Sequence, residues 1–297
     1  MSSTPSTEPE TPPPADVAGA PAPDVREFAS GKLFVDEPAP NVVRIRISNP
    51  AKRGALDHEI LDWLVTIIQQ QDAYCLLLTG DGPVFSAGYD IGNFDEPEFG
   101  DEGGRSAFTD QAESLVAHPF TEAIEALEAY PYPVIAAING YAIGGGLELA
   151  VSCDIRIAAR GVKMGMPPAK IGLIYSHTGL RKFIEVCGVG PTSELFYLGR
   201  NVTAERALDM GLVNQVVDPH ELEEVAIAMA AEIGANSPLS LRGNKEVIRA
   251  LRNAHSSLPE DVARRLVRLR ESCFTSGDFV EGIKAFAEKR QPRWRGR

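Results

Sequence analysis

Hydrophobic positions in the first half of the chain follow the periods of strands and of one helix. Apolar residues alternate with two arginines at Val43, Ile45 and Ile47, which is the period of a strand with one buried face. Apolar residues at helical spacing across 61–68 follow Asp57, a residue type that favours the N-cap. Short continuous apolar runs bounded by turn residues predict strands buried on both faces: 75–78, 134–138 and 155–158.

From Thr178 onward the pattern predicts helices alone. The order Asp, Pro, His, Glu at 218–221 predicts a helix that begins with an N-cap at Asp218. Ser257 and Asp278, each followed three residues later by Glu, predict two further caps. Strands alternating with helices, followed by helices alone, indicate an α/β layered core with a helical C-terminal region.

Composition divides the chain into three regions. The first 24 residues contain seven prolines, four acids and no basic residue, so they cannot bury enough apolar area to offset their ordering entropy. We therefore expect a disordered tail over 1–25, an α/β core over 26–225 and a helical region over 226–297.

Charge and cysteine usage exclude several classes of protein. The 29 basic and 41 acidic residues give a net charge of −12, which argues against binding to nucleic acid or to an anionic membrane. No apolar run reaches the length of a membrane span, and no secretory signal precedes the core. Four isolated cysteines suggest neither a disulfide framework nor a metal site. We expect a cytoplasmic enzyme.

Two glycine-containing turns carry the candidate chemistry. One spans 85–91 and the other 139–148, and each follows a predicted buried strand. Glycine lets backbone N–H groups approach a ligand, and a helix that begins there adds unpaired donors. Two such turns facing one another would form an oxyanion-binding pair. Close packing of a helix against a strand is the alternative explanation for the glycines at 144–146. The chain has no G-x-G-x-x-G, P-loop or G-x-S-x-G motif.

Segments 84–91 and 133–154 and the ending 286–290 together resemble the crotonase (enoyl-CoA hydratase/isomerase) superfamily, in order from about Asn41 to Trp294. The resemblance implies a spiral of ββα units with a C-terminal helical trimerisation region, assembled as a homotrimer or a dimer of trimers. It also implies an acyl-CoA thioester as substrate, with coenzyme A as part of that substrate and with no separate cofactor and no metal.

Residue by residue, the resemblance assigns the oxyanion donors to the backbone N–H groups of Tyr89 and Gly145. The family's Arg/Lys-Asn-Ala-Leu segment, which helps to hold CoA, reads Arg-Gly-Ala-Leu at 53–56. By position, six residues are then expected to contact the substrate: Arg53, Ala55, Ala87, Asp90, Ile91 and Gly144.

Hydration requires two carboxylates that hold and split one water. Glu148 matches the first of these in the family, but Pro168 stands at the position of the second. A proline neither gives nor takes a proton, which argues against standard hydration and double-bond isomerisation.

Segments 171–180 and 85–91 are similar to the methylmalonyl-CoA decarboxylase branch, which also lacks the second glutamate and has a tyrosine where Tyr175 falls. That branch has His where this chain has Tyr89.

Loss of CO2 from a malonyl-type thioester needs a stabilised enolate oxygen and no base. We therefore expect decarboxylation of a short malonyl-type acyl-CoA. Two alternatives stay open: a hydratase or isomerase that uses Glu148, and a non-catalytic CoA-binding protein.

Overall fold

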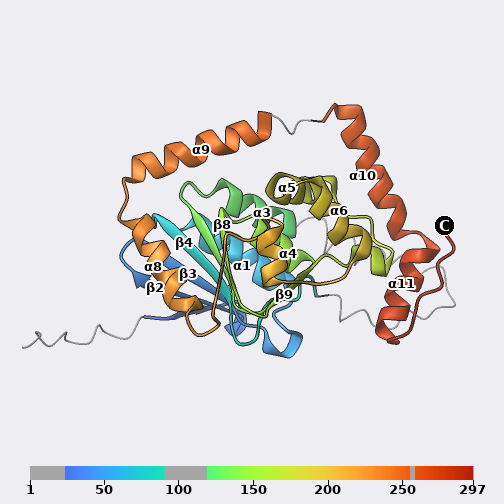
Figure 1. Ribbon diagram of the computed structural model, residues 1–297, viewed down its shortest axis with the longest axis horizontal. Coiled ribbons are helices and arrows are strands. Elements are labelled where there is room, and N and C mark those ends of the chain that lie inside the picture. The colour runs from blue at the N-terminus through green and yellow to red at the C-terminus, as the bar shows by residue number, and fades with distance from the viewer. Residues whose placement is uncertain (1–23, 91–118, 255–257, 297) are drawn as a thin grey trace, which may run out of the picture.

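The computed structural model describes residues 24–90, 119–254 and 258–296. Two sheets form the core (Figure 1). The larger has the order β1-β2-β3-β4-β6-β8-β11, with antiparallel pairs at β1-β2-β3 and parallel pairs from β3 to β11. Its strands are Arg26–Phe28, Leu33–Ala39, Val42–Ile47, Cys75–Gly80, Val134–Ile138, Ile155–Ala159 and Gln215–Val217.

The smaller sheet has the order β10-β9-β7-β5. Its strands are β5 (Val84–Ser86), β7 (Tyr141–Ile143), β9 (Lys163–Gly165) and β10 (Val202–Thr203). Strands β4, β6 and β8 of the larger sheet are followed in sequence by β5, β7 and β9 of the smaller one. This alternation confirms the predicted α/β spiral of ββα units.

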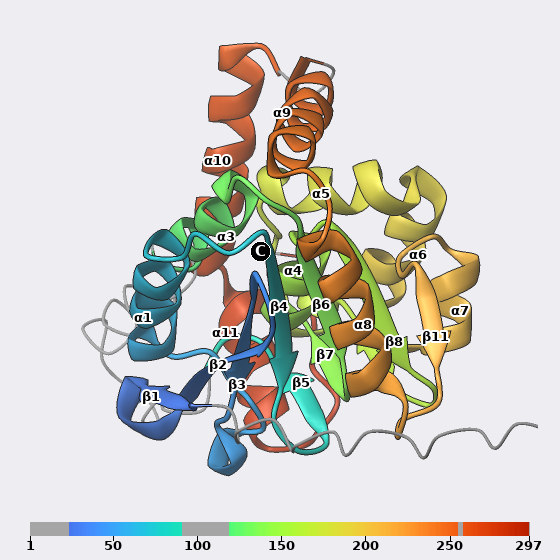
Figure 2. The ribbon, with the colours of Figure 1, turned by 90° about the vertical axis from the view of Figure 1, so that its left-hand side faces the viewer.

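Helices cover the sheets and build the C-terminal region. They are α1 (His58–Gln69), α3 (Pro119–Ala129), α4 (Gly145–Val151), α5 (His177–Cys187), α6 (Val189–Leu198), α7 (Ala204–Asp209), α8 (Leu222–Gly234), α9 (Pro238–Ala254), α10 (Glu260–Phe274) and α11 (Gly277–Ala287). Three 3-10 helices, Ala29–Gly31, Pro50–Lys52 and Pro168–Ile171, complete the described elements. Helix α8 packs across the larger sheet (Figure 2), and the predicted boundary at 225/226 falls inside it.

The sequence pattern located the early elements well. Asp57 caps α1, since its carboxylate accepts the Ile60 N–H at 2.9 Å. The predicted strand at 43–47 is confirmed as β3, but of its two polar positions only Arg46 is partly exposed, and Arg44 is not solvent-facing. Arg44 is buried and forms a two-bond ion pair with Asp36 on β2, and it also contacts Glu223 at the start of α8. Because α8 covers this face of the sheet, the arginine needs a carboxylate partner.

Two of the predicted caps are wrong. Helix α8 begins at Leu222 rather than after Asp218, whose carboxylate accepts from Arg160 at 2.8 Å. Helix α11 is capped by Ser276, which accepts the Phe279 N–H at 3.0 Å. The third cap, Ser257, lies outside the described residues.

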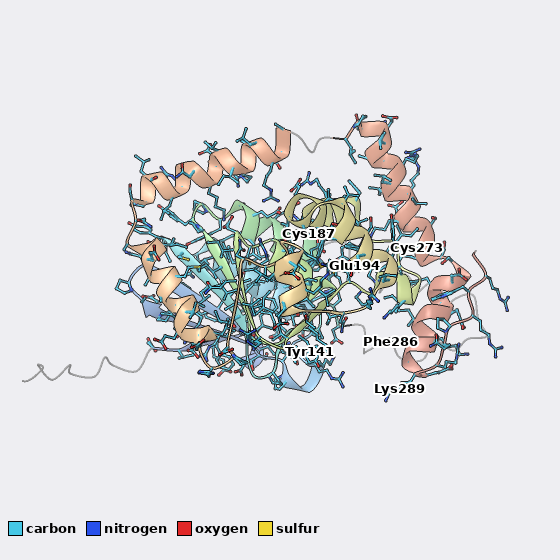
Figure 3. All side chains as sticks on the ribbon, viewed as in Figure 1. Tyr141, Cys187, Glu194, Cys273, Phe286 and Lys289 are labelled. Carbon is cyan, nitrogen blue, oxygen red and sulfur yellow. The ribbon has the colours of Figure 1, made fainter. Side chains whose placement is uncertain are left out.

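The four cysteines are free, and in Figure 3 Cys187 and Cys273 lie on separate helices. In the described part of the chain, no group of three His, Cys, Asp or Glu residues could hold a metal ion. No helix among the described residues is long and apolar enough to cross a membrane.

Candidate active site

The two glycine turns pack directly against one another. Gly88 adopts a φ of +88°, and a Cβ built on it would lie 2.6 Å from the Ile143 carbonyl oxygen and 3.0 Å from the Gly145 nitrogen. A Cβ on Gly146 would lie 2.4 Å from the Ser86 carbonyl oxygen. Only glycine allows this approach, so close packing explains these glycines, and the oxyanion role of the turns stays a prediction.

The turns leave the two assigned N–H groups available. The Leu56 N–H donates to the Gly88 carbonyl (2.8 Å), and the Asp90 N–H donates to the Leu56 carbonyl (3.2 Å). This parallel bridge therefore uses the neighbours of Tyr89 and not its own N–H. Gly145 is the first residue of α4, where an N–H has no partner within the helix. In the described residues neither N–H has an acceptor.

The candidate CoA segment lies beside the first turn, as the resemblance implies. The Ala87 N–H donates to the Arg53 carbonyl at 3.1 Å. Gly54 has a φ of +67°. Asn, the residue of the family pattern, is among the side-chain-bearing residues that adopt this left-handed conformation most readily. The replacement by Gly therefore keeps the backbone path.

Of the other four predicted contact residues, three lie in the described part of the chain. Asp90 forms an ion pair with Lys52, which compensates its charge. Gly144 caps α4 with a φ of +56°, and its N–H donates to the Gly165 carbonyl at 2.9 Å. Ala55 is buried and holds the side-chain amide of Asn49 through its carbonyl at 2.9 Å. Ile91 and the acidic segment 95–102 lie outside the described residues.

Glu148 and Tyr175 meet in the interior. Glu148 projects from the first turn of α4 and is 5% exposed, while Tyr175, just before α5, is 9% exposed. The Tyr175 hydroxyl donates to Glu148 Oε2. The structure thus brings together two residues that are 27 positions apart in the sequence. Pro168 is buried at the start of its 3-10 helix.

Burial dominates the electrostatics of the pair. It raises the pKa of Glu148, whereas the hydrogen bond from Tyr175 and the positive charges of Lys182 and Arg270 act to lower that pKa. Burial, and then the charge of Glu148, raise the pKa of Tyr175 well above its usual value. Glu128 lies within electrostatic reach of Glu148 but is ion-paired with Lys182.

The sequence reasoning missed three residues around this pair. A Cβ on Gly179 would lie 2.6 Å from Tyr175 Cε1 and 2.9 Å from Glu148 Oε1, so glycine makes room for both side chains. A glycine in the first turn of a helix is unfavourable, and that was an available signal. Lys182 and Arg270 reach the pair from α5 and α10, and no local pattern indicated this.

Replacing Glu148 by Gln is expected to raise the unfolding temperature at pH 7, because the buried carboxylate disfavours its charged form. A folded-state pKa above the unfolded value of about 4.5 means that wild-type stability falls as the pH rises through the interval between the two values. The advantage of Gln should therefore shrink at pH 4. Thermal unfolding of both proteins from pH 4 to 8 measures this, and a difference independent of pH would contradict it.

The fold is thus a spiral of two sheets. Its candidate site combines two N–H groups that have no acceptor in the described residues with one buried carboxyl group, that of Glu148. The family model "Enoyl-CoA hydratase/isomerase" matches residues 37–297. The chain belongs to this family, which confirms the resemblance to the crotonase superfamily.

Relatives in this family carry different names. A probable enoyl-CoA hydratase of Bacillus subtilis is 35% identical over 260 residues, covering 86% of this chain and 95% of that protein. The methylmalonyl-CoA decarboxylase of Escherichia coli is 30% identical over 260 residues, covering 86% of this chain and 95% of that protein. A solved methylmalonyl-CoA decarboxylase in complex with 2-nitronate-propionyl-CoA superposes with a TM-score of 0.79 at 28% identity, covering 90% of this chain and 99% of that one.

Proposed function

We propose that this chain is a CoA-thioester lyase that decarboxylates a short malonyl-type acyl-CoA. The observation that carries the proposal is the environment of Glu148. Its carboxyl group binds the Tyr175 hydroxyl, and the nearby acid Glu128 is ion-paired with Lys182. A pair of carboxylates that could hold one water between them is therefore replaced by a carboxyl–phenol pair.

The N–H groups of Tyr89 and Gly145 would bind the thioester oxygen and stabilise the negative charge that develops on it as CO2 departs. A single donor of this kind contributes about 2.7–4 kcal/mol to lowering the barrier. The carbon–carbon bond breaks heterolytically, so the carboxylate leaves as CO2 and its electron pair forms the enolate. The α-carbon then needs one proton, and Glu148 with Tyr175 is a buried proton source beside the two turns.

The remaining assigned residues would hold the CoA portion of the substrate. Arg53 is exposed next to the oxyanion turn, where its guanidinium can reach a phosphate. Ala55, Ala87 and Gly144 present backbone around the same turn, and Asp90 holds Lys52 beside it. Coenzyme A enters as part of the substrate, and this mechanism calls on no separate cofactor.

Incubation with methylmalonyl-CoA, followed by mass spectrometry, tests the proposal. The expected product is propionyl-CoA with release of CO2. Binding of CoA without turnover of any acyl-CoA would instead identify a non-catalytic binding protein.

Hydration or isomerisation is the second candidate, favoured by the names of relatives such as the short-chain-enoyl-CoA hydratase of Clostridium acetobutylicum, which is 31% identical. In this case Glu148 would act with an acid from elsewhere. Hydration of crotonyl-CoA that Glu148→Gln abolishes would favour it.

The C-terminal helices support the proposal of a homotrimer or a dimer of trimers assembled through 226–297. Helix α9 lies along the outside of the molecule (Figure 1) and buries none of its residues. Ion pairs connect it to the core, such as Lys245 with Asp154 at 2.7 Å. A groove of about 1000 Å³ lies between α5, α9 and α10. Large apolar side chains on the two outer helices are exposed: Leu239, Val247, Ile248, Leu251, Val267 and Leu269.

A further inference from the structure

Tyr89 contributes a side chain to the site as well as an N–H group. A Cβ built on Gly145 would lie 3.1 Å from Cε2 and Cζ of the Tyr89 ring, so the ring lies directly over the second oxyanion donor. The ring also packs edge-on with the ring of Phe120, with centroids 4.5 Å apart and planes at 75°. The phenol is therefore held in one place beside both N–H groups.

The Tyr89 phenol also lies close to the Glu148–Tyr175 pair. The Tyr175 side chain acts to lower the pKa of Tyr89 and the charge of Glu148 acts to raise it, while the Tyr175 hydroxyl donates to Glu148. Tyr175 is fixed by Phe196, whose ring packs edge-on at 5.3 Å, and by the space that Gly179 leaves for it. Three titratable groups thus form a line from the interior to the oxyanion turns.

The proton on Glu148 sets the direction of this line. A hydroxyl donates one proton, so when Tyr175 donates to an ionised Glu148, its oxygen can accept from Tyr89. When Glu148 holds a proton, it donates to Tyr175, which can then donate to Tyr89. The Tyr89 proton is in that case free to leave the line.

The charges around the line are compatible with proton transfer. Burial raises the pKa of Tyr89 well above its usual value and also raises that of Glu148, so the phenol stays neutral and the carboxyl holds its proton more readily. The charged groups that act on Glu148 are Lys182, Arg270 and Glu128, of which Lys182 and Glu128 neutralise each other. The positive charge of Arg270 also acts on both tyrosines and opposes the larger effect of burial on their pKa values.

We propose that the Tyr89 phenol is the catalytic proton donor to the α-carbon, and that Tyr175 and Glu148 replace the proton it gives. The proposal rests on the proposed function, because it requires an enolate in the oxyanion site. The α-carbon is bonded to the carbon that carries the bound oxygen, so it lies close to the ring above Gly145.

The steps balance. The electron pair of the enolate forms a C–H bond at the α-carbon while the Tyr89 O–H bond breaks. The Tyr175 proton moves to the Tyr89 oxygen, and the Glu148 proton moves to Tyr175. Glu148 is left as a carboxylate and regains a proton from water, so the enzyme returns to its starting state.

Exchange of the α-protons of propionyl-CoA in D2O tests this role without requiring decarboxylation. We expect the wild type to introduce deuterium at one of the two positions, with one configuration. Tyr89→Phe retains the ring and its packing but should exchange at least about 10²-fold more slowly. Tyr130→Phe is the matched control, since that buried tyrosine binds the Ala73 carbonyl away from the site. Thermal unfolding verifies that all three proteins fold.

Decarboxylation of methylmalonyl-CoA in D2O separates the two proposals. The wild type should give propionyl-CoA with one deuterium in a single configuration, and Tyr89→Phe should give both configurations. Exchange that depends on Tyr89 in an enzyme that does not decarboxylate would overturn the proposed function and leave the donor role standing. Unchanged exchange and configuration in Tyr89→Phe, or no stereospecific exchange by the wild type, would overturn the donor role.

Discussion

Replacing Gly88 by Ala is expected to lower kcat about 10²- to 10³-fold, which is the typical effect of losing one oxyanion donor. The added Cβ would meet the Ile143 carbonyl oxygen at 2.6 Å and the Gly145 nitrogen at 3.0 Å, so the two turns must separate. Their separation moves the Tyr89 N–H away from the Gly145 N–H. Steady-state kinetics with the decarboxylation substrate measures the loss.

Gly161→Ala is the matched control for this substitution. Gly161 has a similar φ of +82°, but its Cβ would meet nothing within 4 Å. Both variants therefore carry the backbone strain of a left-handed alanine, and only Gly88→Ala disturbs the contact between the turns. Equal kcat values in the two variants would contradict the assignment of the oxyanion site.

Replacing Tyr175 by Phe is expected to lower kcat about 10²- to 10⁴-fold, the range for loss of a general acid. The substitution removes the hydroxyl that binds Glu148 and so disconnects the carboxyl group from the oxyanion turns. The affinity for CoA should stay nearly unchanged, because the candidate CoA segment at 53–56 contacts the turn at Ala87 and Gly88.

Kinetics and calorimetry with CoA separate these two effects. Tyr130→Phe again serves as the control for loss of a buried phenol hydroxyl. Turnover by Tyr175→Phe at the wild-type rate would remove Tyr175 from the mechanism. A parallel loss of CoA affinity would indicate a structural role instead.

Elements whose stability is local could be predicted from the sequence. Strand β6 was predicted with its bounds, and α1 with its cap at Asp57. The caps at Asp218 and Asp278 failed because distant groups occupy these carboxylates. Arg160 binds the first, and the N–H groups of Arg295 and Gly296 donate to the second at 2.6 and 2.8 Å.

In the candidate site, too, locally determined features could be predicted and contacts between distant segments could not. The glycine turns could be recognised because strand-to-helix turns have a local signature, and the structure brings Gly88 against Gly145. The contact of Tyr175 with Glu148 depends on how α4 and α5 pack, which no periodicity encodes. Arg270 on α10 acts on Glu148 although the two residues are far apart in the sequence. The position of the Tyr89 ring over Gly145 likewise follows only from the three-dimensional structure.

A competition between methylmalonyl-CoA and crotonyl-CoA in one reaction tests the central claim most directly. Mass spectrometry follows both substrates, and the two rates of loss give the ratio of their kcat/KM values. We predict conversion to propionyl-CoA while crotonyl-CoA persists, since Glu148 binds Tyr175 and since the resemblance implies that Pro168 replaces the second acid of a hydratase. Hydration of crotonyl-CoA without release of CO2 would contradict the account.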